Sequence, residues 1–115
     1  MSQYRENRPW GTFYVLEEKP GFKVKRIVVK ESGRLSLQSH KHRSEHWTVV
    51  EGTATITVNE RILEMTRGSA IDIPLHAKHR LENLHKGNVT IIEVQFGDYL
   101  GEDDIIRYDD AYART

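Results

Sequence analysis

The stretch Gln38–Gly52, QSHKHRSEHWTVVEG, decides how this chain is interpreted. It places a glutamine, three histidines and a glutamate within nine residues, directly before an apolar strand that ends in glycine. Imidazole and carboxylate groups at this density suit a divalent metal such as zinc, manganese or iron. A second stretch, Gly68–Asn83, supplies His79 at the point where a β-barrel would return to the same place. Together the two stretches predict one metal site inside one small β-barrel.

Composition limits the kind of protein and the kind of site. The 115 residues fit one domain with one modest core. Lys and Arg number 17, as do Asp and Glu, so no basic field points to nucleic acid or to a membrane. With no cysteine, any metal must be held by nitrogen and oxygen atoms. No signal peptide or apolar run near 18 residues is found, and we expect a soluble cytoplasmic protein.

Short segments of strand composition, separated by turn residues, fill most of the chain. We expect strands at Thr12–Glu17, Lys23–Lys30, Arg34–His42, Glu45–Glu51, Thr53–Val58, Arg61–Met65, Ala70–Ile73, His79–Glu82 and Val89–Phe96. Regular short strands without an amphipathic helix between them predict an all-β antiparallel barrel or jelly roll. Residues 1–115 then form a single domain, with an N-terminal arm (1–11), a barrel (12–96) and a tail (97–115) that forms a turn or a short helix.

Alternation along the strands selects candidate metal ligands, because successive side chains point to opposite faces. Gln38, His40 and His42 share one face, and Leu35 and Leu37 lie on the other, where another layer or a second subunit must cover them.

The return strand places Glu45 on one face together with Trp47 and Val49, and His46 on the other. Adjacent residues cannot both reach one ion without a bulge, so His46 is set aside. The expected ligands are His40, Glu45 and His79, with Gln38 or His42 as the fourth. The alternative is a polar lining that hydrogen-bonds a sugar without metal.

These residues match a known pattern. Gly33–Gly52 resembles the first cupin motif, and Gly68–Asn83 resembles the second. More closely, the strings RPWG (8–11), FKVKRIVVK (22–30), LSLQSHKHRSEHW (35–47), HRLEN (79–83) and YLGEDDIIR (99–107) resemble type II phosphomannose isomerase. That is the cupin domain found C-terminal in bifunctional mannose-1-phosphate guanylyltransferase/mannose-6-phosphate isomerases. The resemblance implies a cupin (double-stranded β-helix) barrel.

The chain departs from the family pattern in three places. No N-terminal Gly-rich nucleotide-binding stretch is found, so GDP-mannose synthesis is not implied. Only two residues separate His42 from Glu45, whereas Gln38-x-His40-x4-Glu45 has the common spacing and is similar to the Gln/His/Glu/His zinc set of type I phosphomannose isomerases. His76 occupies a position where the second motif usually has glycine.

The resemblance implies interconversion of mannose 6-phosphate and fructose 6-phosphate through an enediol. The cofactor is then a divalent metal ion, zinc first and manganese, iron, cobalt or nickel as alternatives. Candidate catalytic residues are Glu93, His76 and Lys78, with His42 as a further base if it is not a ligand. Candidate phosphate-binding residues are Arg80, Lys78, Arg43, Lys25 and Arg26, of which the arginines suit bidentate binding. We expect Trp47 and Trp10 in the core or at an interface.

Cupins commonly dimerise through an exchanged N-terminal strand, so we expect a homodimer in which residues 4–17 lie on a neighbour's sheet. Two other functions remain open. One is a non-catalytic, regulatory cupin that binds a sugar phosphate or nucleotide sugar. The other is a different metal-cupin reaction such as dioxygenation. The cations beside the histidines, namely Arg43, Lys78 and Arg80, favour a phosphorylated substrate.

Overall fold

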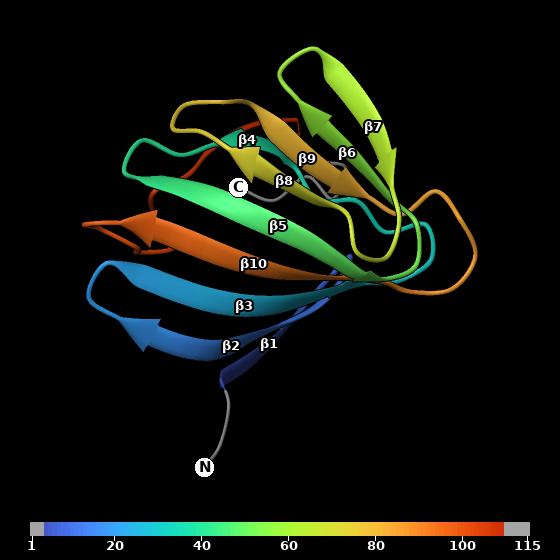
Figure 1. Cartoon of the computed structure of the whole chain (residues 1–115), viewed down its shortest axis with the longest axis horizontal. Helices are drawn as coiled ribbons and strands as arrows, with labels where there is room; N and C mark the ends of the chain where they lie inside the picture. The colour runs from blue at the N-terminus through green and yellow to red at the C-terminus, as the bar shows by residue number, and fades with distance from the viewer. Residues whose placement is uncertain (1–3, 110–115) are drawn as a thin grey trace.

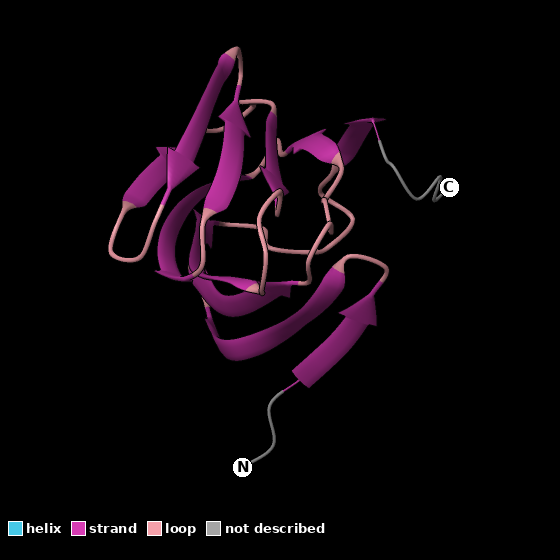
Figure 2. Cartoon of the chain, turned by 90° about the vertical axis from the view of Figure 1, so that its right-hand side faces the viewer, coloured by secondary structure: helices cyan, strands magenta, loops and turns pink. Residues whose placement is uncertain are grey.

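The computed structural model describes residues 4–109, which form strands, turns and loops only. In that part of the chain there is no helix, and hence none long and apolar enough to cross a membrane (Figure 2). The strands are β1 (Tyr4–Arg8), β2 (Gly11–Lys19), β3 (Phe22–Val29), β4 (Leu37–Ser39), β5 (Arg43–Glu51), β6 (Ala54–Val58), β7 (Arg61–Met65), β8 (Ala70–Ile73), β9 (His79–Glu82), β10 (Val89–Gly97) and β11 (Ile106–Asp109).

The strands form two antiparallel sheets that face each other (Figure 1). One sheet has the order β1-β2-β3-β10-β5-β8, and the other has the order β11-β4-β9-β6-β7. Strands distant in sequence, such as β3 and β10, are therefore hydrogen-bonded neighbours. The predicted all-β jelly roll is confirmed.

The inner face of the six-stranded sheet is polar at one end and apolar at the other. Partner residues on β3, β10 and β5 form rows across the sheet, and their side chains point inward. The polar rows are Lys25, Glu93 and Trp47, followed by Lys23, Gln95 and Glu45. The adjacent apolar row is Ile27, Ile91 and Val49. The candidate site therefore lies at one end of the interior, and the hydrophobic core at the other.

The apolar end supplies the packing that holds the two sheets together. Ile91 from one sheet and Ile56 and Leu81 from the other are all 0% exposed. Burial of each such side chain contributes roughly 1.5–3 kcal/mol to the hydrophobic driving force. Ala54, Ile56 and Val58 of β6 belong to this core, and Thr55 between them is buried as well.

One motif glycine is required by a close backbone approach. Gly52 follows β5 with a φ of 79°, in the left-handed region that favours glycine. A Cβ atom there would lie 2.3 Å from the carbonyl oxygen of Asn88, which precedes β10. This glycine lets the chain turn from β5 into β6 against the start of β10.

Three predicted segments differ from the structure. Regular strand geometry over Arg34–His42 is limited to β4, and Leu35 is buried in the chain's own core. The simple two-face alternation fails here because only three residues form a regular strand, and adjacent residues such as Leu35 and Ser36 are both buried. The N-terminal arm contains β1, which pairs with β2. The tail makes a turn at Gly101–Asp104 and then forms β11, not a helix, up to residue 109; residues 110–115 lie outside the described part.

Candidate metal centre

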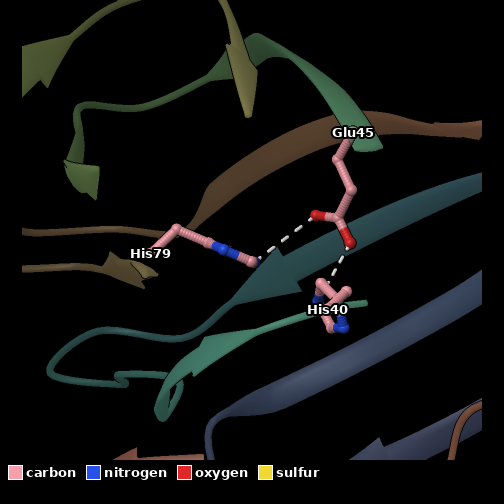
Figure 3. A group of neighbouring side chains, drawn as sticks. All are labelled: His40, Glu45 and His79. Carbon is pink, nitrogen blue, oxygen red and sulfur yellow. Dashed lines mark ion pairs between the residues drawn. The ribbon is translucent and has the colours of Figure 1, made fainter. Parts of the chain in front are cut away.

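His40, Glu45 and His79 converge at the polar end of the interior (Figure 3). His40 directly follows β4, Glu45 lies on β5, and His79 begins β9. The Nε2 atoms of His40 and His79 lie 3.2 Å and 3.7 Å from the two carboxylate oxygens of Glu45. All three side chains are buried, and one donor atom from each lies within 4.8 Å of the others.

Backbone carbonyl groups fix the orientation of both imidazole rings. Nδ1 of His79 lies 3.0 Å from the carbonyl oxygen of Ala77, and Nδ1 of His40 lies 2.6 Å from that of Asp104. With a metal bound, a proton on each Nδ1 would leave the two Nε2 lone pairs, which face Glu45, free for the ion. The ring orientation is thus the one that metal-binding histidines usually have.

The loop that holds His40 is itself held by Asp104. Its two carboxylate oxygens accept the backbone N–H groups of Lys41 and His42, each at 2.9 Å. Although partial burial opposes ionisation, these hydrogen bonds lower the pKa of Asp104. The segment after β10 therefore supports the His40 loop through one carbonyl and one carboxylate.

The three donors fit a divalent ion. Nitrogen and oxygen ligands bind zinc at about 2.0–2.2 Å, so neighbouring donor atoms in a tetrahedral site lie roughly 3.4 Å apart. The distances of 3.2 Å and 3.7 Å from Glu45 to the two rings agree with this spacing. Two imidazoles and one carboxylate would leave a further coordination position open for water or substrate.

Glu45 is ionised and His79 is neutral, as ligation requires. Burial alone would raise the pKa of Glu45, but the hydrogen bond with His40 and the charge of Arg43 hold it well below its usual range. Burial lowers the pKa of His79. A neutral imidazole beside a carboxylate is ready to bind a metal without first releasing a proton.

Arg43 contacts two of the three ligands. Its Nε donates to Oε2 of Glu45 at 2.8 Å, and its Nη2 lies 3.1 Å from Nε2 of His40. The guanidinium group is the charge partner of Glu45 in the absence of a metal. Despite burial, the surrounding carboxylates raise its pKa further.

Glu93 lies beside the three ligands and is connected to Glu45 through an indole. Nε1 of Trp47 donates to Oε1 of Glu45 at 2.9 Å and to Oε2 of Glu93 at 3.1 Å. The amide of Gln95 donates to the other oxygen of Glu93 at 2.7 Å. Burial, with the charge of Glu45 nearby, raises the pKa of Glu93 to about 7. Glu93 is 4% exposed and shares the inner face of β10 with buried Val89 and Ile91.

A cavity of about 90 Å³ opens onto these groups. Gln38 lines it and is the register partner of His79, so the two side chains share one face of the sheet. His42 is exposed, packs edge-on against Tyr99 and lines a separate surface pocket. The structure therefore brings Gln38, but not His42, to the cavity.

The other two catalytic candidates lie away from this cavity. His76 and Lys78 are both exposed, and the Nζ atom of Lys78 lies over the ring of Tyr108. His76 adopts a φ of 69°, the left-handed conformation of the glycine that the motif usually has, and its N–H donates to the carbonyl oxygen of His40. The geometry of this turn is therefore kept without the glycine.

The phosphate candidates divide between the cavity and other places. Arg43 and Lys25 line the cavity. Arg80 is buried elsewhere, where its Nε donates to the carbonyl oxygen of Leu35 and its Nη2 pairs with Asp109. The guanidinium of Arg26 lies over the ring of Tyr14, on the outer face of β3.

Sequence reasoning missed several residues of the site. Trp47 is buried as predicted, but its indole N–H also links the carboxylates of Glu45 and Glu93. Gln95, which donates to Glu93, is the next residue after Glu93 on the inner face of β10. The alternation of β10 gave a signal for Gln95, since it continues the face of Glu93. No local pattern indicated the remaining residues, which come from the chain ends: Asp104, which holds the His40 loop, and the cavity-lining Arg8, Glu102 and Arg107.

Comparison with known proteins gives the family. Residues 2–110 match the family described as "Mannose-6-phosphate isomerase C-terminal". The chain belongs to this family. This member of the mannose-6-phosphate isomerase family has a His–Glu–His site at the polar end of its interior.

Two curated relatives of this isomerase-family chain are named as polysaccharide biosynthesis proteins, and a third is named as a guanylyltransferase. Xanthan biosynthesis protein XanB of Xanthomonas campestris is 51% identical over 108 residues, which are 94% of this chain and 23% of XanB. Alginate biosynthesis protein AlgA of Pseudomonas aeruginosa is 49% identical, covering 94% of this chain and 22% of AlgA. A mannose-1-phosphate guanylyltransferase of Klebsiella pneumoniae is 44% identical, covering 98% and 25%. The chain thus spans about a quarter of the length of these relatives.

Solved structures confirm the cupin fold of this family member. The capsular polysaccharide assembling protein CapF of Staphylococcus aureus has a TM-score of 0.82 at 18% identity, covering 95% of this chain and 33% of CapF. KdgF of Halomonas has a TM-score of 0.77 at 13% identity, covering 86% and 90%. The cupin domain of Schizosaccharomyces pombe Cnp3 has a TM-score of 0.68 at 17% identity, covering 75% and 65%.

Proposed function

We propose that this chain is a metal-dependent aldose–ketose isomerase that interconverts mannose 6-phosphate and fructose 6-phosphate through an enediol. One observation carries the proposal. The His40, Glu45 and His79 set shares a cavity with Glu93, a buried carboxyl group whose pKa is raised to about 7. A metal-ligand set beside a carboxyl group poised near neutral pH is what proton transfer next to a carbonyl group requires.

His40, Glu45 and His79 would hold the divalent ion, with Gln38 as the fourth protein ligand because it shares a sheet face with His79. Zinc is our first choice, since two imidazoles, one carboxylate and one amide oxygen suit it. When bound, the metal would supply Lewis acidity, which would polarise the carbonyl group of the sugar and offset negative charge that develops on its oxygen.

Glu93 is the proposed base. In the open-chain aldose it accepts the proton from C2, which gives an enediolate with its charge on O1. The hydroxyl proton of O2 then moves to O1, and Glu93 returns its proton to C1 as the C2 carbonyl of the ketose forms. One proton leaves carbon and one returns, so the base ends each turnover in its starting state. Trp47 and Gln95 donate to the two oxygens of Glu93 and hold the carboxylate in one orientation. A pKa of about 7 allows both accepting and returning the proton at neutral pH.

Ser36 and the cations of the cavity wall would bind the rest of the sugar phosphate. The hydroxyl oxygen of Ser36 lies in the cavity wall, is buried, and has no hydrogen-bond partner within residues 4–109. A sugar hydroxyl group would satisfy it. Lys25, Arg8 and Arg107 also line the cavity and give its mouth a positive wall for an anionic substrate.

The direct test uses the chain itself, loaded with zinc, manganese or cobalt in turn. Mannose 6-phosphate carrying deuterium at C2 is added, and NMR follows both fructose 6-phosphate formation and the fate of the label. We expect ketose formation with deuterium transferred to C1 or lost to solvent. His79→Ala is expected to lose metal and activity together, whereas Glu93→Gln keeps the metal and loses turnover by at least about a hundredfold.

Three results would contradict the proposal. Folded, metal-loaded protein that forms no fructose 6-phosphate would rule it out and, if sugar phosphate still bound, would favour the non-catalytic binding function. Oxygen consumption with Fe(II) would indicate dioxygenation. Full metal stoichiometry in His79→Ala would show that the site has been misplaced.

We also propose a homodimer. β1 is an edge strand of the six-stranded sheet and is held by β2 alone, so the same pairing could be made with a neighbouring copy. Sedimentation equilibrium at micromolar concentration tests this. A mass equal to one 13.4 kDa chain would refute it.

A further inference from the structure

Two lysines of β3 and one glutamate from the segment after β10 form a cluster next to the candidate metal centre. Lys23 and Lys25 are only 6% and 5% exposed, although lysine is rarely buried. Nζ of Lys25 lies 2.9 Å from both carboxylate oxygens of Glu102, and Nζ of Lys23 lies 3.4 Å from Oε2. Lys23 also donates to the carbonyl oxygen of Leu100 at 2.9 Å. The two ammonium groups therefore form an anion-binding site, and the carboxylate of Glu102 occupies it.

Glu102 differs from the other two carboxylates of the cavity. Glu45 and Glu93 lie on central strands and are buried, whereas Glu102 lies between β10 and β11 and its side chain is 49% exposed. Lys25 lowers the pKa of Glu102 against the effect of burial, so the group is an anion. An exposed carboxylate on a connecting segment can leave its lysines at low cost, while the lysines stay fixed on β3.

The position of this cluster suits the far end of a phosphorylated sugar. Lys25 is the register partner of Glu93, and Glu93 is the partner of Trp47 beside the metal ligands. Neighbouring strands lie about 4.8 Å apart, so β3 and β5 are separated by roughly 10 Å. A hexose with its reacting carbons beside Glu45 on β5 would place a terminal phosphate near β3.

We infer that Lys23 and Lys25 form a phosphate subsite that Glu102 occupies in the free protein and that the substrate's phosphate takes over. A phosphate group offers more acceptor oxygens and more negative charge than a carboxylate, so two ammonium groups favour it. The identity of the sugar rests on the proposed isomerase function, but the exchange of one anion for another does not.

The test measures inorganic phosphate binding to the metal-free full chain by calorimetry, in a low-salt buffer without other oxyanions. Glu102→Gln removes the competing charge and is expected to lower the phosphate Kd about tenfold. Lys25→Gln is expected to raise it at least about tenfold. Glu60→Gln and Lys86→Gln change the same residue types at exposed turn positions and should stay within about twofold of the wild type.

Phosphate binding that is no tighter in Glu102→Gln overturns the inference. Because the Glu102 side chain is half exposed, this variant is expected to fold, and its circular dichroism and thermal unfolding check this point. The two proposals fail separately. Tighter phosphate binding in Glu102→Gln without fructose 6-phosphate formation keeps the subsite and removes the isomerase. Isomerase activity with no change in phosphate binding or in KM for this variant removes only the subsite.

Discussion

The Nε atom of Arg43 donates to Oε2 of Glu45 at 2.8 Å, from two residues earlier on the same strand face. The same guanidinium group also reaches Nε2 of His40 at 3.1 Å. A side-chain cation thus uses two of the three atoms that a divalent ion would need. The arginine keeps Glu45 ionised, but it must withdraw before a metal can bind.

Replacing Arg43 with methionine should therefore tighten metal binding. We expect the zinc Kd of Arg43→Met to fall about tenfold or more, because two cations no longer compete for one carboxylate. Competition with a chromophoric chelator measures the change. Arg61→Met, on exposed β7, serves as the control and should leave the Kd unchanged. Weaker zinc binding in Arg43→Met would show that the arginine supports the metal and does not compete with it.

The raised pKa of Glu93 should appear in the pH dependence of stability. Its pKa is about 7 in the folded chain and 4.5 ordinarily. Between pH 4.5 and 7 the folded state holds a proton that the unfolded chain has released, so the free energy of unfolding falls as pH rises and levels above pH 7. The whole interval corresponds to about 3 kcal/mol.

Glu93→Gln should lack this slope. Urea unfolding in EDTA, from pH 5 to pH 8, is expected to show the wild type losing a few kcal/mol relative to the variant as pH rises. Exposed Glu60→Gln should run parallel to the wild type. A difference between wild type and Glu93→Gln that stays constant with pH would mean that Glu93 titrates normally.

The sequence predicted the framework of the site better than its surroundings. Alternation correctly placed Glu45, Trp47 and Val49 on one face, which is the buried one, because β5 is a regular strand inside the sheet. It failed over Arg34–His42, where the chain bends and only β4 keeps strand geometry. Adjacent residues Leu35 and Ser36 line the same cavity, which a strict two-face rule cannot give.

Local sequence patterns could not predict the site residues that come from distant segments of the chain. Asp104 reaches the His40 loop from 64 residues along the chain, and Arg8 approaches the cavity from β1. Only the pairing of β11 with β4 and of β1 with β2 brings these residues near the site. Such long-range pairings leave no periodic signal in the sequence of either segment.

Removal of the indole N–H of Trp47 should destabilise the folded chain. Trp47→Phe keeps a ring in the core but leaves Glu45 and Glu93 without a shared donor, at a cost of about 1–3 kcal/mol in the free energy of unfolding. Denaturant titrations of the single variants and of Trp47→Phe with Glu93→Gln complete a double-mutant cycle. We expect a coupling of about 1 kcal/mol. Strict additivity would mean that the Trp47–Glu93 hydrogen bond contributes nothing.

Asp104 should affect metal binding without touching the metal. Asp104→Ala frees the backbone N–H groups of Lys41 and His42, so the loop no longer fixes the ring of His40. The zinc Kd should rise about tenfold or more, as is typical when an outer partner of a ligand is lost. Asp72→Ala removes a carboxylate that pairs with His46 on the outer face and is the matched control. Equal zinc affinities in the two variants would exclude this supporting role.

Because the interior has a polar end and an apolar end, the residues of the candidate site can be changed separately from those of the core. Cohesion of the sandwich resides in Ile91, Ile56, Leu81 and their neighbours, a few residues along the strands from the reactive groups. We therefore expect single replacements of Lys25, Glu93 or Gln95 to leave the two layers packed together. The residues that hold the two sheets together and the residues of the candidate site occupy separate stretches of the same strands. A designer can therefore change the site residues without changing the core.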